Sequence, residues 1–308
     1  MYLKHVIESQ QFDRETLDNL FDLSAKMEKY SQKDKVLHNK IMASLFYEPS
    51  TRTRMSFESA MIRLGGTVIS TESAGQFSSA AKGETLEDTI RIISTYSDVI
   101  VLRHYESGAS QRACSVSRVP IINAGDGAGQ HPTQALLDLY TIKKEKGKID
   151  GIKIALVGDL YYGRTVRSLS YLLAKYDNIF IYFCAPRVVR MRDDIKEYLT
   201  RHNVKWEEDD DLKRVAKKVD VIYQTRIQRE RFADKQEEYN EAKGIYVINK
   251  ELMQHVPDDT IILHPLPRVD EISPEVDDDP RAAYFRQAEN GLYVRMALLK
   301  NVLFSNQE

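Results

Sequence analysis

Hydroxyl and guanidinium groups crowd one short stretch of the chain, immediately after the apolar run at 41–47. The residues concerned are Ser50, Thr51, Arg52, Thr53 and Arg54. We expect Ser50 to be the N-cap of a helix, because a short polar side chain there can accept a hydrogen bond from a first-turn amide. The free amides, the helix dipole, the hydroxyls and an arginine would then surround one point, an arrangement that suits phosphate. Glu58 lies four residues after Arg54 and is expected to neutralise it, which leaves Arg52 to supply the charge.

Cationic side chains follow most of the predicted strands. We expect strands at 41–47, 67–71, 98–104, 119–124, 152–158, 179–183, 219–225 and 260–265. The cations at or after their carboxyl ends are Arg52, Arg103, His104, His131, Arg164, Arg226, His264 and Arg268. Open α/β sheets bind ligands at these ends, so we expect them to converge in a cleft between two domains. With 44 basic against 46 acidic residues, the positive charge would be local, and the ligand small and multiply negative.

The stretch GDLYYGRT at 158–165 has the spacing of a nucleotide phosphate-binding loop. However, Arg164 stands where that loop needs lysine, and no convincing aspartate for magnesium follows, which argues against nucleotide hydrolysis. The glycines also fail the dinucleotide pattern, and the next strand ends in Cys184 rather than in an acid that could hold a ribose. An arginine is better suited to a carboxylate, which it can bind with two parallel hydrogen bonds.

For three further residues, the sequence allows both a functional role and a structural one. Arg226 could bind a ligand or pair with Glu230 at the surface. His131 precedes a proline and is expected at a helix N-cap, where it could donate to a polarised oxygen, although a core histidine fits the segment equally well. Lys82 lies in a loop of small residues that is either a mobile lid or a solvated surface.

Short apolar runs alternate with amphipathic helical stretches along nearly the whole chain. This alternation is typical of parallel sheets with helices on their faces. We therefore predict an α/β fold with two domains, each a mainly parallel sheet flanked by helices, bridged by two interdomain helices. The expected ranges are 1–135, 136–290 and a C-terminal helix, 291–308, that returns to the first domain.

Helix signals support these divisions. Residues 13–30 show helical periodicity with Asp13 as N-cap, and 132–146 begins with a proline and stops before Gly147. A strongly apolar helix is expected at 290–304. The acidic run at 207–211 reads as a solvated loop or a helix start rather than as a group of metal ligands.

Composition argues against several function classes. The balanced charge is unlike that of a nucleic-acid binder, and no apolar run approaches the roughly 20 residues of a membrane span. Cys114 and Cys184 are far apart and show no metal-type spacing with the histidines, so no metal site is expected and both thiols should be buried and reduced. The first residues lack the apolar segment of a signal peptide, which indicates a cytoplasmic protein.

Seven motifs occur in an order known from one enzyme family: FYEPSTRTR, KGET, RH, HPTQ, GDLYYGRTVRS, TRIQRER and HPLPRVDEI. On these motifs the chain resembles the aspartate carbamoyltransferase family over its whole length. The combination of STRTR with HPTQ is highly specific for carbamoyltransferases. HPLP together with KGET points to aspartate as the acceptor, because ornithine enzymes typically carry HCLP at that position.

The resemblance implies a carbamoyl phosphate domain at 1–135, an aspartate domain at 136–290, and a homotrimer whose active sites are shared between chains. By similarity, the phosphate would be held by Ser50, Thr51, Arg52, Thr53 and Arg103. The carbonyl oxygen would be polarised by Thr53, Arg103 and His131. The carbamoyl nitrogen would be held by Gln134 and the carbonyl of Leu266. The aspartate would be bound by Arg164, Arg226, Gln228, Pro267 and Lys82. Ser78 and Lys82 would come from the neighbouring chain.

The implied reaction is attack of the aspartate amine on the carbonyl carbon, with donors already directed at the developing oxyanion. It requires no metal or other cofactor, because phosphate is a good leaving group and can accept the amine proton. Two alternatives remain at this stage: a transferase for another amine such as ornithine, whose positive charge would clash with Arg164 and Arg226, and a non-catalytic anion-binding homologue. The sequence leaves open whether separate regulatory chains bind.

Overall fold

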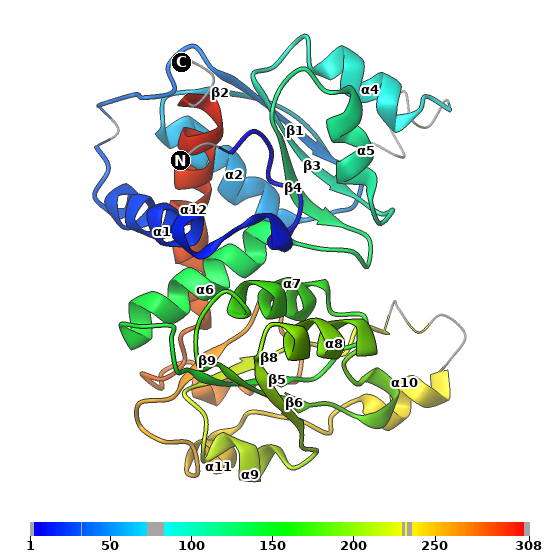
Figure 1. The fold of residues 1–308 in the computed structure, drawn as a ribbon, viewed down its shortest axis with the longest axis vertical. Coiled ribbons are helices and arrows are strands. Elements are labelled where there is room, and N and C mark those ends of the chain that lie inside the picture. Colours follow the sequence, from blue (N-terminus) through cyan, green and yellow to red (C-terminus); the bar gives the residue numbers. More distant parts are fainter. Residues whose placement is uncertain (1–2, 32, 73–82, 230–231, 233–235, 305–308) are drawn as a thin grey trace. The chain divides into compact units, whose positions relative to one another are not determined.

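The computed structural model describes residues 3–31, 33–72, 83–229, 232 and 236–304. The chain forms two compact units (Figure 1). Unit 1 contains Met1–Leu137 and Glu289–Glu308, and unit 2 contains Asp138–Ala288. Two helices have residues in both units, namely α6 (Pro132–Lys146) and α12 (Tyr284–Phe304).

Unit 1 is built on a four-stranded parallel sheet with the order β2-β1-β3-β4. Its strands are β1 (Ile41–Phe46), β2 (Thr67–Glu72), β3 (Val99–His104) and β4 (Ile121–Asp126). The three strands β1, β3 and β4 are almost wholly buried, whereas the edge strand β2 is largely exposed. A parallel sheet covered by helices on both faces requires such continuous apolar strands.

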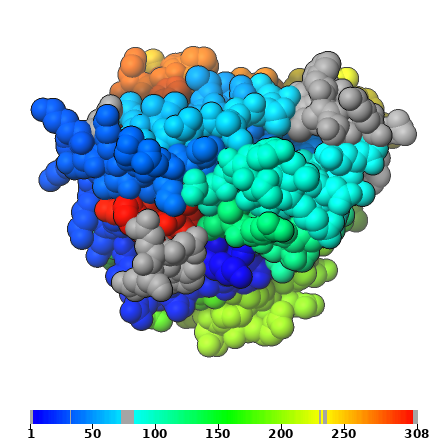
Figure 2. Space-filling model, turned by 90° about the horizontal axis from the view of Figure 1, so that it is seen from above, coloured from blue at the N-terminus to red at the C-terminus, as the bar shows by residue number. Residues whose placement is uncertain are grey.

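The helices of unit 1 cover both faces of this sheet. They are the 3-10 turn η1 (Ser9–Gln11), α1 (Arg14–Glu28), α2 (Thr51–Arg63), α4 (Leu86–Ile93) and α5 (Ala109–Val116). Helices α4 and α5 lie on one face, where Leu86, Ile90 and Ala113 join alternate residues of β1 and β3 in a core. In Figure 2 the cyan to blue-green surface of unit 1 includes these two helices.

Unit 2 is built on a five-stranded parallel sheet with the order β7-β6-β5-β8-β9. Its strands are β5 (Lys153–Val157), β6 (Phe180–Cys184), β7 (Lys205–Glu208), β8 (Val221–Gln224) and β9 (Ile261–Leu263). Its helices are α7 (Arg164–Leu173), α8 (Asp193–Arg201), α9 (Leu212–Ala216), α10 (Gln236–Ala242) and α11 (Lys250–Met253), with short 3-10 turns η3 (Arg187–Val189) and η5 (Pro274–Val276). Helices α9 and α11 pack on the face that carries Ala155 and Val157.

The predicted α/β class with two parallel sheets flanked by helices is confirmed. The predicted cap of the first helix is also confirmed, since the Asp13 carboxylate accepts from the Thr16 amide at 2.7 Å. Helix α6 spans the predicted 132–146, and Gly147 follows it with a φ of +72°. None of the helices in the described part of the chain is long and apolar enough to cross a membrane.

The prediction of a solvated loop or helix start at 207–211 is partly wrong. Glu207 and Glu208 belong to β7, which pairs with β6 at the edge of the sheet. Asp209 is only 5% exposed, and its carboxylate accepts from the Arg214 guanidinium. Asp211 does begin a helix, because its side chain accepts from the Arg214 amide. Backbone pairing with a buried neighbouring strand outweighed the poor strand propensity of these acids.

Candidate functional site

In unit 1, the predicted phosphate-binding residues follow three neighbouring parallel strands. The pairing register places Phe46 of β1 opposite Arg103 of β3, and His104 opposite Asp126 of β4. The turn that starts α2 follows β1, and the loop that leads to His131 follows β4. Because parallel strands end at one edge of a sheet, the three segments leave the sheet on the same side.

Helix α2 begins at Thr51, with Ser50 as its N-cap in an extended conformation. The expected capping hydrogen bond is not made: within the described residues, the Ser50 side chain accepts no bond from the first turn. The first-turn amides are therefore not satisfied by their own cap, which suits an external anion. Arg52 has no ion-pair partner in the described ranges, and partial burial lowers the pKa of its guanidinium. Thr53 is buried, with 7% of its surface exposed.

Arg54 is a structural residue, as expected, but its partner is not the predicted one. Its guanidinium lies 3.0 Å from the carboxylate of Glu72. Glu58 instead accepts a hydrogen bond from the Ser70 hydroxyl at 2.7 Å. The reason is that α2 packs beside β2, so the end of that strand supplies a closer acid than the next helical turn does.

Arg103 is largely buried and lies beside an acid that the sequence interpretation did not single out. Its guanidinium is 3.4 Å from Glu48, and the two side chains are 14% and 22% exposed. It also approaches the Ala124 carbonyl at 3.4 Å. Glu48 stands between β1 and the hydroxyl-rich turn, and an acid inside such a cationic motif was the signal that could have identified it. These contacts hold Arg103 at the edge where the turn of α2 begins.

His104 does not add a charge to this edge, contrary to expectation. The residue is 3% exposed, and its ring stacks on Tyr105 and packs at a tilt against Tyr47, with centroid distances of 4.3 and 4.6 Å. Its Nδ1 accepts from the Glu106 amide at 3.1 Å. Burial lowers the pKa of His104, so the ring is neutral near pH 7 and acts as a packing residue.

His131 ends the glycine-rich loop and begins α6. Its carbonyl accepts from the amides of Gln134 and Ala135, so it is the N-cap, as predicted. The ring is 4% exposed, and its Nδ1 lies 3.4 Å from the Thr133 hydroxyl. Gln134 is on the same first turn and is also buried. Asp126 holds the preceding loop, since its carboxylate accepts from the amides of Gly108 and Gln130.

In unit 2, the predicted carboxylate-binding residues also follow three neighbouring strands. The register pairs Val157 of β5 with Gln224 of β8, and Tyr223 of β8 with Leu263 of β9. The next segments carry Arg164 after β5, Arg226 and Gln228 after β8, and Leu266 and Pro267 after β9. The described structure therefore brings these five residues to one edge of the second sheet.

Gly158 allows two of these segments to approach each other. Its φ is +104°, and a Cβ atom there would lie 2.4 Å from the Thr225 carbonyl oxygen. The buried carboxylate of Asp159 accepts from the Tyr162 amide and shapes the loop that leads to Arg164 at the start of α7. The segment thus forms a strand–loop–helix connection that ends in an arginine, as the sequence indicated.

Arg226 and Gln228 are both half-buried and follow directly after β8. The alternative partner Glu230 lies outside the described residues. Leu266 has a φ of +49°, and the peptide bond between Leu266 and Pro267 is cis. A left-handed leucine is uncommon, so the backbone here is constrained by its surroundings.

Arg268 and His264, which were expected among the ligand-binding cations after β9, are already paired within unit 2. Arg268 forms a bidentate ion pair with Asp277, which lowers the pKa of that carboxylate. His264 is 2% exposed and lies 2.7 Å from Glu271. Both were grouped with the ligand-binding cations from their position after a predicted strand, and both instead hold the loop itself.

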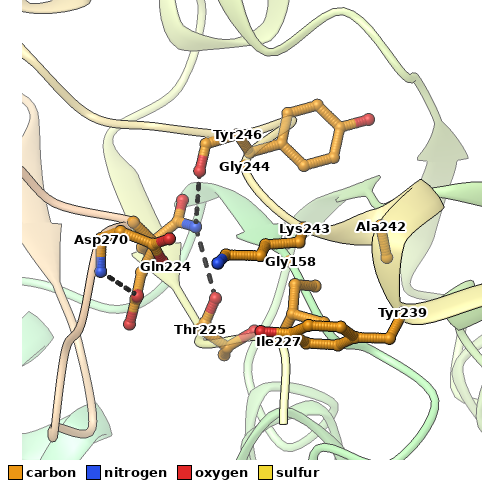
Figure 3. A pocket seen from close by; sticks show the side chains of 11 residues that line it. Gly158, Gln224, Thr225, Ile227, Tyr239, Ala242, Lys243, Gly244, Tyr246 and Asp270 are labelled. Atoms are coloured by element: carbon orange, nitrogen blue, oxygen red, sulfur yellow. Dashed lines mark hydrogen bonds between the residues drawn. The ribbon is translucent and has the colours of Figure 1, made fainter. Parts of the chain in front are cut away.

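The segments that follow β5, β8 and β9 also contribute residues to a pocket in unit 2 (Figure 3). Gln224 bridges it by donating to the carbonyls of Thr225 and Tyr246, and Lys243 extends toward Thr225. None of the predicted substrate-binding residues lines this pocket, although Arg226 directly follows Thr225. Its lining includes Thr225 and Ile227, the residues on either side of Arg226 in the chain.

Ser78 and Lys82 lie outside the described residues, so their predicted roles remain predictions. A search of the described ranges finds no group of His, Cys, Asp and Glu that could hold a metal ion. Both cysteines are free, and burial raises the pKa of Cys184 to about 12.

Comparison with known proteins assigns the chain to a family. Residues 4–144 match the family model for the carbamoyl-P binding domain of aspartate/ornithine carbamoyltransferase, and residues 150–302 match the one for its Asp/Orn binding domain. Aspartate carbamoyltransferase 1, chloroplastic, from Pisum sativum is 62% identical over 304 residues, which cover 98% of this chain and 79% of that protein.

Two further comparisons agree. The aspartate carbamoyltransferase catalytic subunit of Methanocaldococcus jannaschii is 52% identical over 308 residues, with 99% of each chain covered. A crystal structure of aspartate transcarbamoylase from Trypanosoma cruzi in complex with carbamoyl phosphate and aspartate has a TM-score of 0.92 and 43% identity, with 97% of each chain covered. The chain therefore belongs to the aspartate/ornithine carbamoyltransferase family.

Proposed function

We propose that this chain transfers the carbamoyl group of carbamoyl phosphate to the amine of L-aspartate, releasing N-carbamoyl-L-aspartate and phosphate. One observation carries the proposal. A helix turn without a side-chain cap stands at the carboxyl edge of the first sheet, and two arginines follow strands of the second. Phosphate suits the first group, and a dicarboxylate suits the second.

Unit 1 would bind carbamoyl phosphate. The first-turn amides of α2, the hydroxyls of Ser50, Thr51 and Thr53, and the guanidinium of Arg52 would hold the phosphate oxygens. Arg103, His131 and Thr53 would donate to the carbonyl oxygen. A buried donor such as His131 is worth more here than in water, because the surrounding dielectric is low.

Unit 2 would bind aspartate and the carbamoyl nitrogen. Arg164 and Arg226 would each bind a carboxylate, with Gln228 and Pro267 as further contacts. The Leu266 carbonyl, together with Gln134, would accept from the carbamoyl amine. The amine of aspartate then attacks the carbonyl carbon, the C–O bond to phosphate breaks, and phosphate takes up the amine proton. Holding two anions in contact is the main difficulty, and the arginines offset their repulsion.

The acceptor is tested by measuring product formation with aspartate and with ornithine. We expect N-carbamoyl-aspartate and phosphate in equal amounts, and no reaction with ornithine. Turnover of ornithine alone would reject aspartate as the acceptor. Binding of carbamoyl phosphate without turnover of either amino acid would indicate a non-catalytic homologue.

We further propose that the chain forms a homotrimer in which Ser78 and Lys82 complete the site of a neighbouring copy. Exposed apolar residues on unit 1 support an interface there. Met55 and Ile62 lie seven residues apart on one face of α2 and are 59% and 62% exposed. The edge strand β2, which precedes Ser78 in the sequence, also exposes Ile69. Light scattering on the purified protein tests this, and a monomer at assay concentrations would reject it.

The reaction would serve pyrimidine synthesis, as the names of the relatives imply. The free thiols of Cys114 and Cys184 fit a reducing compartment such as the cytoplasm, which is our proposed location. Mixing the purified protein with candidate regulatory chains would decide whether such partners bind.

A further inference from the structure

The loop that follows β9 is held by the residues at its two ends. The His264 Nδ1 atom accepts from the Leu266 amide at 2.7 Å. The His264 Nε2 atom lies 2.7 Å from one carboxylate oxygen of Glu271. The other carboxylate oxygen accepts from the amides of Val269 and Asp270, each at 3.1 Å. The last of these bonds is visible in Figure 3.

These bonds define the charge states of the pair. The Leu266 amide can only donate, so Nδ1 must be an unprotonated acceptor and the ring proton must be on Nε2. His264 is therefore neutral and donates to an ionised Glu271. Burial alone would raise the pKa of Glu271, but the hydrogen bonds from His264 and the loop amides lower it below its ordinary value. Both side chains are buried, at 2% and 6% exposure.

A second set of bonds ties the same loop to the core of unit 2. The His264 amide donates to Gln287 at 2.8 Å. Gln287 in turn donates to the buried carboxylate of Asp138 at 2.6 Å, and Tyr223 donates to the same carboxylate at 2.7 Å. The start of the loop is thus connected to α12, α6 and β8 through side chains that are themselves satisfied. Such a network is rigid, because moving one member leaves another unpaired.

The restraint acts on a residue whose backbone conformation is unfavourable. Leu266 has a φ of +49°, a left-handed conformation that brings Cβ too close to the following carbonyl oxygen. Conformations of this kind persist only where the surroundings enforce them. The bond from the Leu266 amide to His264 fixes the peptide on one side of this residue, and Glu271 fixes the ring that accepts that bond.

We propose that Glu271, acting through His264, is a positioning residue that directs the Leu266 carbonyl toward the carbamoyl nitrogen. This inference rests on the proposed function, which assigns the carbonyl to that nitrogen. Glu271 itself would not touch a substrate. Its loss should therefore affect recognition of the carbamoyl group and leave recognition of the phosphate group unchanged.

The test is the variant Glu271→Gln, with Asp220→Asn as the matched control. Asp220 also accepts from a backbone amide of unit 2, that of Lys153 at 2.7 Å, but at the amino ends of the strands. Three quantities are measured for each protein: kcat/KM for carbamoyl phosphate, and the inhibition constants of inorganic phosphate and of acetyl phosphate. Acetyl phosphate carries a methyl group in place of the carbamoyl amine, so it cannot donate to Leu266.

For Glu271→Gln we expect kcat/KM for carbamoyl phosphate to fall about 10- to 100-fold, because a displacement of the Leu266 carbonyl by up to about 1 Å can reduce the rate by that much. The inhibition constants of phosphate and acetyl phosphate should stay near those of the unmodified protein, because neither ligand uses the carbonyl. Asp220→Asn should lower the melting temperature without a selective loss of kcat/KM for carbamoyl phosphate.

Equal losses for all three ligands in Glu271→Gln, or no loss in a folded variant, would overturn the positioning role. An unmodified protein without carbamoyltransferase activity would instead overturn the proposed function.

Discussion

Gly158 offers a sharp test of how the second sheet shapes the proposed aspartate site. In Gly158→Ala, the new Cβ atom would lie 2.4 Å from the Thr225 carbonyl oxygen and 2.7 Å from its hydroxyl. An ordinary contact begins at 3.4 Å, so the Thr225 carbonyl must retreat by about 1 Å. Arg226 is the next residue, and its guanidinium would move with that peptide.

The strain of a left-handed alanine must be separated from this displacement. Gly151 provides the control, because it has a φ of +76° and a Cβ atom there would meet nothing within 4 Å. Both alanine variants should lose about 1–2 kcal/mol of unfolding free energy from backbone strain. Only Gly158→Ala should also move Arg226.

Steady-state kinetics with each substrate varied in turn provides the assay, and urea unfolding measures stability. We expect kcat/KM for aspartate to fall about 100-fold in Gly158→Ala and to stay unchanged in Gly151→Ala. The inhibition constant of phosphate should be the same in both variants, because phosphate is assigned to unit 1. A folded Gly158→Ala protein with normal use of aspartate would refute the link between Gly158, Thr225 and the arginine.

Four further outcomes follow from the proposed site. Arg52→Ala should lower kcat by about 100- to 1,000-fold and weaken phosphate inhibition, as measured by product formation. Arg226→Ala should raise KM for aspartate while phosphate inhibition persists; an unchanged aspartate dependence would show that its role is misassigned. Because its pKa is lowered in the folded protein, the ionised Glu271 carboxylate stabilises the fold at pH values above the ordinary pKa of 4.5, and this stability is lost as the pH falls through the lowered pKa. In urea unfolding, Glu271→Gln should therefore lose less stability between neutral and acid pH than the unmodified protein does. Mixed trimers of inactive Lys82→Ala and Arg52→Ala chains should regain activity if sites are shared, and verified mixed trimers without recovery would count against sharing.

The strands and the two long helices could be predicted because their signals are local. Six-residue apolar runs such as 41–46 leave little choice but a buried parallel strand, and Pro132 with Gly147 marks both ends of α6. The residues that follow the strands could be named for the same reason, since a strand end is a local feature. The edge strand β7 was missed because its acids have low strand propensity and only pairing with β6 explains it.

Partner choice could not be predicted, because it depends on contacts between residues distant in sequence. Arg54 pairs with Glu72 and not with Glu58, since β2 lies beside α2. His264 and Glu271 are seven residues apart, and nothing in their types indicates that one carboxylate organises the whole loop. Charge at a strand end therefore identified candidates, and the partners of His104, His264 and Arg268 showed which of them hold their own loops.

The way in which α6 and α12 are divided constrains any attempt to separate the two halves of the protein. Pro132 to Leu137 falls in unit 1 and Asp138 to Lys146 in unit 2, so a cut between the units severs a helix instead of a loop. Helical fragments shorter than about 12 residues are marginal in water, and both new ends would expose apolar surface. A permuted gene that opens the chain in an exposed connection should therefore yield soluble protein more readily than two genes that each encode one half.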